Sequence, residues 1–91
     1  MTFEWDDKKA AANKKKHGVS FEEAATVFRD ALYLVFADPD HSIKEGRFLI
    51  FGASSEGRLL VVSYTQRAKS IRLISAREAT RRERKQYEED H

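Results

Sequence analysis

Eight side chains, all cations or hydroxyls, could together bind a phosphodiester and assist its cleavage. RNA can be cleaved without a metal ion when a base takes the 2′-hydroxyl proton, cations stabilise the phosphorane, and an acid protonates the leaving oxygen. One well-placed acid or base accelerates such a reaction about 100- to 10,000-fold, and one preorganised donor at the developing charge contributes about 3 to 4 kcal/mol. The residues that could supply these groups are Lys8, Lys16, His17, Arg47, Tyr64, Arg72, Arg77 and Tyr87.

Other kinds of active site have less support. The acidic residues fall in first turns, loops and the C-terminal tail, where helix capping and solvation place them. His17, His41 and His91 lie on a helix end, a loop and the chain terminus, and none has a second His or a Cys four residues away. The chain has no Cys, and its four Gly are scattered. The sequence therefore predicts no paired-carboxylate hydrolase, no metal, no cofactor and no phosphate loop.

Several candidates also have a purely structural explanation. His17 ends a predicted helix, where the helix dipole stabilises an imidazolium. Tyr64 shares a strand face with Leu60 and Val62, which favours core packing with the hydroxyl at an edge. Tyr87 could equally fix the last helix to the sheet or present its hydroxyl to a ligand.

The arginines divide in the same way. Arg72 lies between Ile71 and Leu73 in a predicted strand, so alternation places it on the opposite sheet face, in a pocket or at the surface. Arg47 opens another strand, and a binding role and a structural role are equally supported. Arg77 could lie on a solvated face of the last helix. Sequence alone leaves these alternatives open.

Composition indicates one small globular domain. A chain of 91 residues buries about 60 to 70 % of its unfolded surface, which allows one core. The net charge is only +2, but positive charge is concentrated in "NKKKHG" and "REATRRERK", where it can attract phosphates. No apolar run approaches the roughly 20 residues of a membrane span, and the N-terminus lacks the order of a signal peptide. We expect a cytoplasmic protein with one domain over residues 1–91 and no membrane contact.

The first third of the chain predicts a strand and two helices. "TFEW" has apolar residues at the strand period of two. Asp6 can cap a helix over 7–17, which carries bases in its last turn before Gly18. Ser20 and Glu23 have the spacing of a capping box for a second helix. An apolar stripe then follows at Phe21, Ala24, Ala25, Phe28 and Leu32.

The rest of the chain is richer in strands. "ALYLVF" fits a strand that is buried on both faces, or one that directly follows the helix. After the loop "HSIKEG", strands over 47–52 and 58–65 form a hairpin with a loop of about five residues. A turn over 66–69 then leads to a last strand over 70–76.

A helix completes the predicted fold. Ser75 and Glu78 repeat the capping-box spacing, which predicts that Ser75 caps a helix over about 76–88. The resulting order is β-α-α-β-β-β-β-α. We therefore predict an α+β domain with helices packed on one side of a mainly antiparallel sheet.

Several separate motifs resemble the BrnT family, the toxins of bacterial type II toxin-antitoxin modules. They are W-D-x-x-K, N-x-x-K-H-G-V-x-F-x-E-A, the "GRFLIFG" and "LLVVSYT" strands, and I-R-x-I-S-A-R followed by E-R-x-x-Y. The resemblance runs from Phe3 to Tyr87 and implies a RelE-like fold. It also implies a ribonuclease that stops growth until a BrnA-like antitoxin, with a ribbon-helix-helix DNA-binding domain, inactivates it. Toxin and antitoxin together would repress their own promoter, with the toxin reaching DNA only through that complex.

The resemblance also assigns roles to residues. It implies that Arg47, Arg72 and Arg77 hold the scissile phosphate, for which the planar guanidinium is suited, and that His17 or Tyr87 exchanges protons. Lys16, Tyr64 and Arg72 are the expected RNA contacts, and a toxin dimer or a 2:2 complex with antitoxin is compatible with the family. The residues assigned in this way are Lys16, His17, Arg47, Tyr64, Arg72, Arg77 and Tyr87.

One position departs from the family pattern. Members often carry an acid directly before the strand arginine, whereas this chain has Gly46 there and Glu45 one place earlier. If that acid orients the arginine, Arg47 is held more loosely here. The alternative function, from another class, is a non-catalytic basic module that docks a partner protein or nucleic acid.

Overall fold

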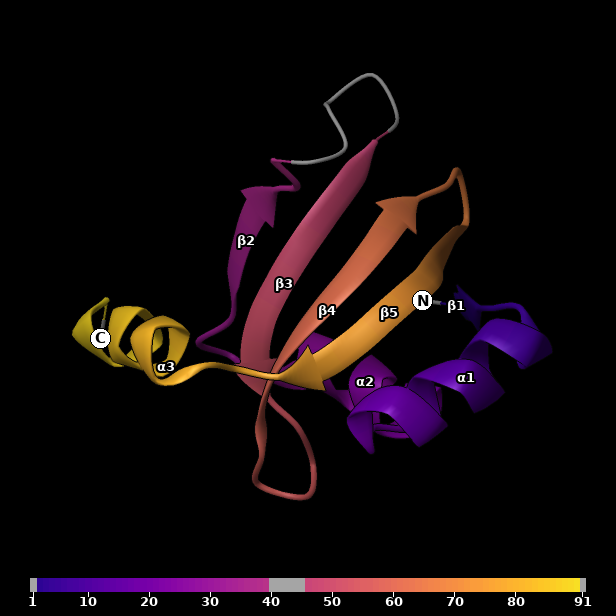
Figure 1. Ribbon diagram of the computed structural model, residues 1–91. Helices are drawn as coiled ribbons and strands as arrows, with labels where there is room; N and C mark the ends of the chain where they lie inside the picture. The colour runs from indigo at the N-terminus through magenta and orange to yellow at the C-terminus, as the bar shows by residue number, and fades with distance from the viewer. Residues whose placement is uncertain (1, 40–45, 91) are drawn as a thin grey trace.

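The chain folds around one five-stranded sheet with strand order β1-β5-β4-β3-β2 (Figure 1). The computed structural model describes residues 2–39 and 46–90, so the predicted loop residues His41 and Glu45 and the terminal His91 lie outside the described residues. The elements are β1 (Thr2–Glu4), α1 (Asp7–His17), α2 (Phe21–Thr26), the 3₁₀ helix η1 (Val27–Arg29), β2 (Leu34–Ala37), β3 (Arg47–Ala53), β4 (Leu59–Gln66), β5 (Ser70–Glu78) and α3 (Arg81–Glu89).

The sheet is mainly antiparallel, and the fold class is α+β, as predicted. β2, β3, β4 and β5 pair in antiparallel fashion, while β1 adds in parallel to the outer edge of β5. α1 and α2 lie together at one side of the sheet, and α3 lies apart from them at the opposite end of the view (Figure 1). The prediction that all helices pack on one side was therefore wrong for α3.

Local capping signals fix α1. The Asp6 carboxylate accepts hydrogen bonds from the amides of Lys8 and Lys9, at 2.8 and 3.1 Å. These bonds lower the pKa of Asp6, because they favour its charged form. Gly18 ends the helix with φ at 71°, a conformation that costs little only for glycine. The predicted helix over 7–17 is confirmed at both ends.

The second helix is shorter than predicted. Ser20 caps it by accepting from the amide of Glu23, but α2 ends at Thr26 and gives way to η1. The Asp30 carboxylate then accepts from the amide of Leu32, which turns the chain toward β2. Leu32 is 50 % exposed, so the predicted apolar stripe ends at Phe28.

β2 is an edge strand and not a strand buried on both faces. It pairs with β3, and the exposed fraction of Val35 is 42 %. The continuous apolar run of the sequence was misleading because half of it forms the turn before the strand. The alternative prediction, a strand that directly follows the helix, was wrong as well, because η1 and residues 30–33 separate α2 from β2.

The strand-to-helix junction differs from the predicted one. β5 continues to Glu78 because Ser75, Ala76 and Arg77 all pair with β4. Thr80 caps α3 instead of Ser75, through a complete capping box with Glu83. The prediction that Ser75 caps the last helix was therefore wrong.

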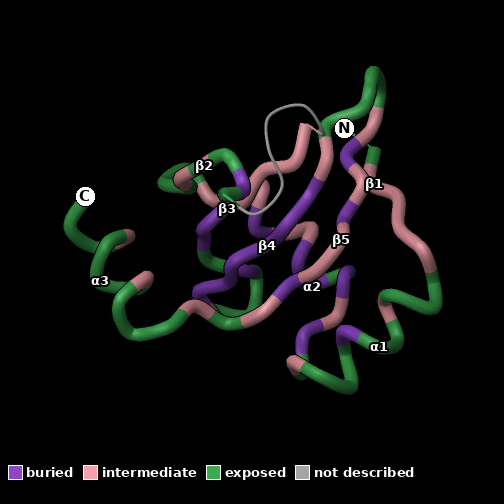
Figure 2. The backbone as a smooth tube through the Cα atoms, turned by 45° about the horizontal axis from the view of Figure 1, so that its top comes forward, coloured by how far each residue is buried: buried purple, intermediate pink, exposed green. Residues whose placement is uncertain are grey.

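The hydrophobic core lies between α1, α2 and η1 and one face of the sheet (Figure 2). Its fully buried large side chains include Val19, Phe21 and Val27 from the helical side and Leu60 from β4. Gly52 of β3 brings η1 close, since a Cβ there would lie 2.8 Å from Cγ1 of Val27. α3 has no buried residue. No helix within residues 2–39 and 46–90 is long and apolar enough to cross a membrane.

Candidate functional site

The sheet face opposite the core brings arginines together. Arg47 of β3 lies opposite Thr65 of β4, which lies opposite Arg72 of β5. Directly opposed residues of neighbouring strands project to the same face. Tyr64 has the opposite orientation, is 7 % exposed, and packs against Phe28 in the core. Arg47 and Arg72 therefore share the open face, and Tyr64 does not.

A β-bulge adds the third arginine to this face. Ser63 and Tyr64 of β4 are opposed by Ser75 and Leu73 of β5, so Ile74 is an extra residue in β5. Residues five apart in a regular strand point to opposite faces, and one extra residue reverses that relation. Arg77 consequently projects to the same side as Arg72.

The open face contains a hollow of about 400 Å³, which we call the arginine hollow. β3, β4, β5 and α3 all contribute to it, and the acids Asp38 and Glu83 lie in its wall beside two of the three arginines. Arg72 lies next to the hollow, on β5 directly opposite Thr65 of β4. Its Nη1 atom is 3.8 Å from Oε1 of Glu4 in β1. The lining includes Arg47, Ser63, Ile74, Ser75, Arg77 and Glu83.

Arg47 carries a buried donor without a partner. Its Nε atom and Oγ1 of the neighbouring Thr65 are both buried and have no hydrogen-bond partner among the described residues. A buried polar group in this state costs about 1 to 3 kcal/mol, so native proteins contain few of them. The Arg47 side chain lines the hollow, and its unpaired donor would gain a partner if the side chain turned toward an anionic ligand there.

Arg77 is held by the last helix. Its Nη1 and Nη2 atoms donate to the two carboxylate oxygens of Glu83, at 2.7 and 2.9 Å. Glu83 Oε1 also accepts from the amide of Thr80 at 2.9 Å. The pKa of Glu83 is lowered to about 2, chiefly by the hydrogen bonds from Arg77, and the pKa of Arg77 is raised by the same pair. The guanidinium is thus fixed in orientation, and a carboxylate occupies its outer edge.

A second hollow, of about 220 Å³, adjoins the first, and we call it the lysine hollow. It lies between α1 and β5, and it shares Ile74 and Ser75 with the arginine hollow. Its lining includes Lys9, Asn13, Lys16, His17, Ile74 and Ser75. The predicted residues Lys16 and His17 therefore lie beside the arginine hollow but in a separate depression.

Asn13 fixes α1 against β5. Its amide nitrogen donates to the carbonyl oxygens of Ala76 and Val19 at 2.8 and 3.0 Å, and its oxygen accepts from the amide of Ala76 at 3.0 Å. β1 pairs with β5 only as far as Arg72, so the Asn13 side chain takes the place of a neighbouring strand at Ala76. The arrangement sets the position of Lys16 and His17 relative to Arg77.

Tyr87 lies on a different side of α3. Its hydroxyl donates to Asp30, and burial together with this bond raises the pKa of Tyr87 to about 12. Tyr87 does not line the arginine hollow. Its position supports the structural explanation, in which it holds the last helix against the turn before β2.

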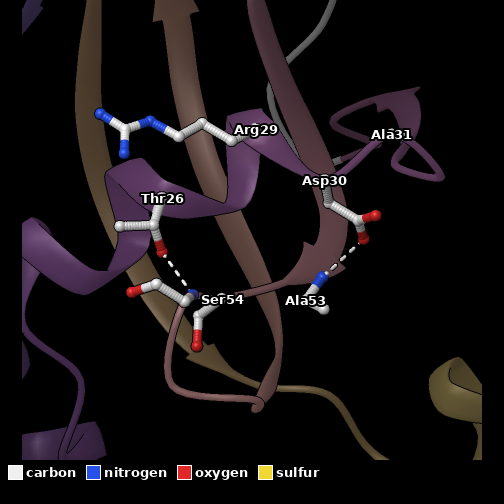
Figure 3. Close-up of a pocket in the computed structure, with 7 residues that line it drawn as sticks. Thr26, Arg29, Asp30, Ala31, Ala53 and Ser54 are labelled. Atoms are coloured by element: carbon white, nitrogen blue, oxygen red, sulfur yellow. Dashed lines mark hydrogen bonds between the residues drawn. The ribbon is translucent and has the colours of Figure 1, made fainter.

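A third hollow, of about 380 Å³, lies between η1 and the β3–β4 turn (Figure 3). Its polar groups already serve the fold. Thr26 Oγ1 accepts from the amide of Ser55, and Asp30 accepts from the amide of Ala53. The Arg29 side chain points away from Ser54 in this view (Figure 3). We assign this hollow no ligand.

Glu83 and Asn13 are two positioning residues that the sequence analysis did not identify. Both fall within motifs quoted above, Glu83 in E-R-x-x-Y and Asn13 in N-x-x-K-H-G. Their spacing gave no signal, because each acts on a residue of β5 that only folding brings near. Within residues 2–39 and 46–90 no three His, Cys, Asp or Glu side chains form a group that could hold a metal ion.

Comparison with known proteins identifies the family. A family model described as "Ribonuclease toxin, BrnT, of type II toxin-antitoxin system" matches residues 5–83. The chain belongs to the BrnT family. The match includes the residues of the arginine hollow and the lysine hollow. It identifies the chain as the toxin of a type II toxin-antitoxin system, in a ribonuclease family. The resemblance inferred from the motifs is thereby confirmed.

A solved structure shares the fold. The crystal structure of the Brucella abortus ribonuclease toxin BrnT matches with a TM-score of 0.70 and 23 % sequence identity. The match covers 89 % of this chain and 99 % of the Brucella chain. A comparison with curated protein sequences gives no match. The similarity supports an α+β BrnT fold of the kind described above.

Proposed function

We propose that this BrnT-family protein is a metal-independent endoribonuclease in which the arginine hollow binds the scissile phosphate. The observation that carries the proposal is that Arg47 and Arg77 line one hollow, with Nε of Arg47 buried and unpaired within the described part of the chain. A turn of the Arg47 side chain into the hollow would let a phosphate oxygen satisfy that donor. Donors arranged in advance around a developing charge are an effective means of stabilising a phosphorane.

His17 is the proposed proton-transfer group. It lies in the lysine hollow, which adjoins the arginine hollow at Ser75. Tyr87 is less suited, because its hydroxyl is engaged by Asp30 and its pKa of about 12 disfavours ionisation near neutral pH. Arg72, beside the hollow, would assist in holding the RNA, as would Lys16. We leave Tyr64 out of the proposed site because it packs in the core.

The biological context is proposed from family membership. We infer a RelE-like toxin that acts in the cytoplasm, where RNA cleavage would inhibit translation and growth. A BrnA-like ribbon-helix-helix antitoxin would neutralise it, in a 2:2 complex or beside a toxin dimer, and the complex would repress its own promoter.

The alternative is a non-catalytic module that docks a partner protein or nucleic acid through the same face. One observation favours it. Arg77 already donates to Glu83 through both terminal nitrogens and to the carbonyl of Glu78 through Nη1, which uses three of its five N–H groups. Fewer donors are thus left for a developing charge, which a module that only binds a partner does not have to stabilise.

The deciding experiment incubates the purified chain with naked RNA in EDTA, beside the Arg47→Ala and His17→Ala variants. Arg84→Ala is the matched control, because Arg84 is an exposed arginine of α3. Cleavage by the wild type and the control, with an about 100- to 1,000-fold loss in the two variants, supports the proposal. If the folded wild type leaves RNA intact, both naked and on translating ribosomes, the non-catalytic alternative holds.

A further inference from the structure

The lysine hollow is positioned to extend the proposed site along a nucleic acid strand. It adjoins the arginine hollow at Ile74 and Ser75, and these two residues include the bulge of β5. A nucleic acid strand that leaves the arginine hollow over the bulge therefore enters the lysine hollow directly.

The lysine hollow offers cations on a rigid support. Lys9 and Lys16 are seven residues apart on α1, about two helical turns, so they lie on one side of the helix. Neither lysine has an ion pair within the described residues. Two hydrogen bonds between Asn13 and Ala76 hold this side of α1 against β5. Two unpaired cations in a fixed depression favour an anionic ligand.

We propose that the lysine hollow binds a phosphate of single-stranded RNA adjacent to the scissile phosphate, through Lys9 and Lys16. The identity of the ligand rests on the proposed function, because one RNA strand can place consecutive phosphates in the two adjoining hollows. The site carries no acid among its lining residues, whereas Asp38 and Glu83 lie in the arginine hollow. Lys9 and Lys16 therefore contribute affinity for the strand, while the arginine hollow and His17 contribute the chemistry.

The test measures RNA binding separately from cleavage. The probe is a fluorescent, single-stranded 2′-O-methyl RNA of about eight nucleotides, which cannot be cleaved through its 2′-hydroxyl and falls within the usual site size of single-strand binders. Its Kd is measured by anisotropy at several KCl concentrations for wild type, Lys9→Gln and Lys14→Gln. Lys14 is the matched control, because it lies on the same helix with the same charge and does not line the hollow.

The proposal predicts that Lys9→Gln weakens binding about 5- to 10-fold and reduces the slope of log Kd against log salt by about 0.7, the value for one lost phosphate contact on a single strand. Lys14→Gln changes the Kd and the salt slope by less than half as much. A dinucleotide with a single phosphate, which the arginine hollow would hold, shows no difference between Lys9→Gln and wild type.

Other outcomes overturn the inference, and each of them can be distinguished from a failure of the proposed function. If Lys9→Gln and Lys14→Gln weaken binding equally, or neither does, the hollow is not a subsite, whether or not the wild type cleaves RNA. If Lys9→Gln weakens binding of poly-glutamate but not of RNA, the hollow is a site for acidic protein. If the lysine-dependent binding is present but the wild type cleaves no RNA, the inference stands and the catalytic proposal fails.

Discussion

Arg77 and Glu83 form a two-bond ion pair that joins the last strand to the last helix, and the same pair lies in the wall of the arginine hollow. α3 has no buried residue, and its attachment includes this pair and the bond from Tyr87 to Asp30. A helix held mainly by polar contacts opens at a lower free energy than the core. The contact that orients a candidate phosphate-binding group is thus also one that docks α3.

The pair makes the docking of α3 dependent on pH. The pKa of Glu83 falls from 4.5 to about 2 on folding, so its stabilising effect is complete above pH 4.5 and is lost as the pH falls toward 2. Because Arg77 is partly exposed, we expect Glu83→Gln to destabilise α3 by only about 1 kcal/mol at pH 7. Hydrogen exchange of the α3 amides, compared between variant and wild type at each pH, should show the difference shrink toward pH 2. An equal difference at pH 3 and pH 7 would contradict this.

Arg47 should be more important for RNA cleavage than for stability. Arg47→Met keeps an unbranched side chain and removes the buried, unpaired Nε, so we expect unchanged stability or a gain of about 1 kcal/mol in the free energy of unfolding. RNA cleavage should fall about 100-fold or more. Urea unfolding and a cleavage assay on the same preparation check both results.

Arg58→Met provides the contrasting control for that prediction. Arg58 donates to the buried carboxylate of Glu23, whose pKa is lowered to about 2 chiefly by this hydrogen bond, so the same substitution there should lower the urea midpoint. A lowered midpoint for Arg47→Met as well would show that its guanidinium supports the fold.

The close approach of η1 to β3 gives a prediction for the core. Gly52→Ala places a methyl group 2.8 Å from Cγ1 of Val27 and should destabilise the protein by about 1 to 3 kcal/mol. Val27→Ala alone also destabilises, because it leaves a cavity. The double variant should be more stable than the sum of the single effects implies, which thermal or urea unfolding can measure. Simple additivity would mean that η1 moves away instead.

The elements that sequence reasoning located well are those fixed within a few residues. Asp6 and Gly18 act on the ends of α1 through neighbouring amides, so their spacing was sufficient. Ser75 had the same local signal, yet pairing of β5 with β4 outweighed it and moved the start of α3 to Thr80. Leu32 fitted the helical period, but the Asp30 side chain turned the chain before that position. In both errors a contact outside the pattern was decisive.

The candidate site depended still more on contacts distant in sequence. Arg72 and Arg77 share a face because of the bulge at Ile74, and no residue type in that strand marks the bulge. The family motifs pointed to residues that the structure divides among two adjoining hollows, the core and the α3 contact. The assignment of Tyr64 and Tyr87 to the site remains a prediction that their positions do not support.

Asn13 belongs to α1 and not to the sheet. Its loss should disturb the site more than the loss of any other residue outside the sheet. Asn13→Ala leaves the amide and carbonyl of Ala76 and the carbonyl of Val19 without their buried partner, which should cost about 2 to 3 kcal/mol in urea unfolding.

α1 then loses its fixed position against β5. Cleavage of long RNA should therefore fall by more than the unfolded fraction of the variant explains, and it should fall even at temperatures where the variant is fully folded. Lys14→Ala, one residue further along the exposed surface of α1, should change neither property. Full activity of folded Asn13→Ala would show that the position of Lys16 and His17 relative to Arg77 does not depend on this side chain.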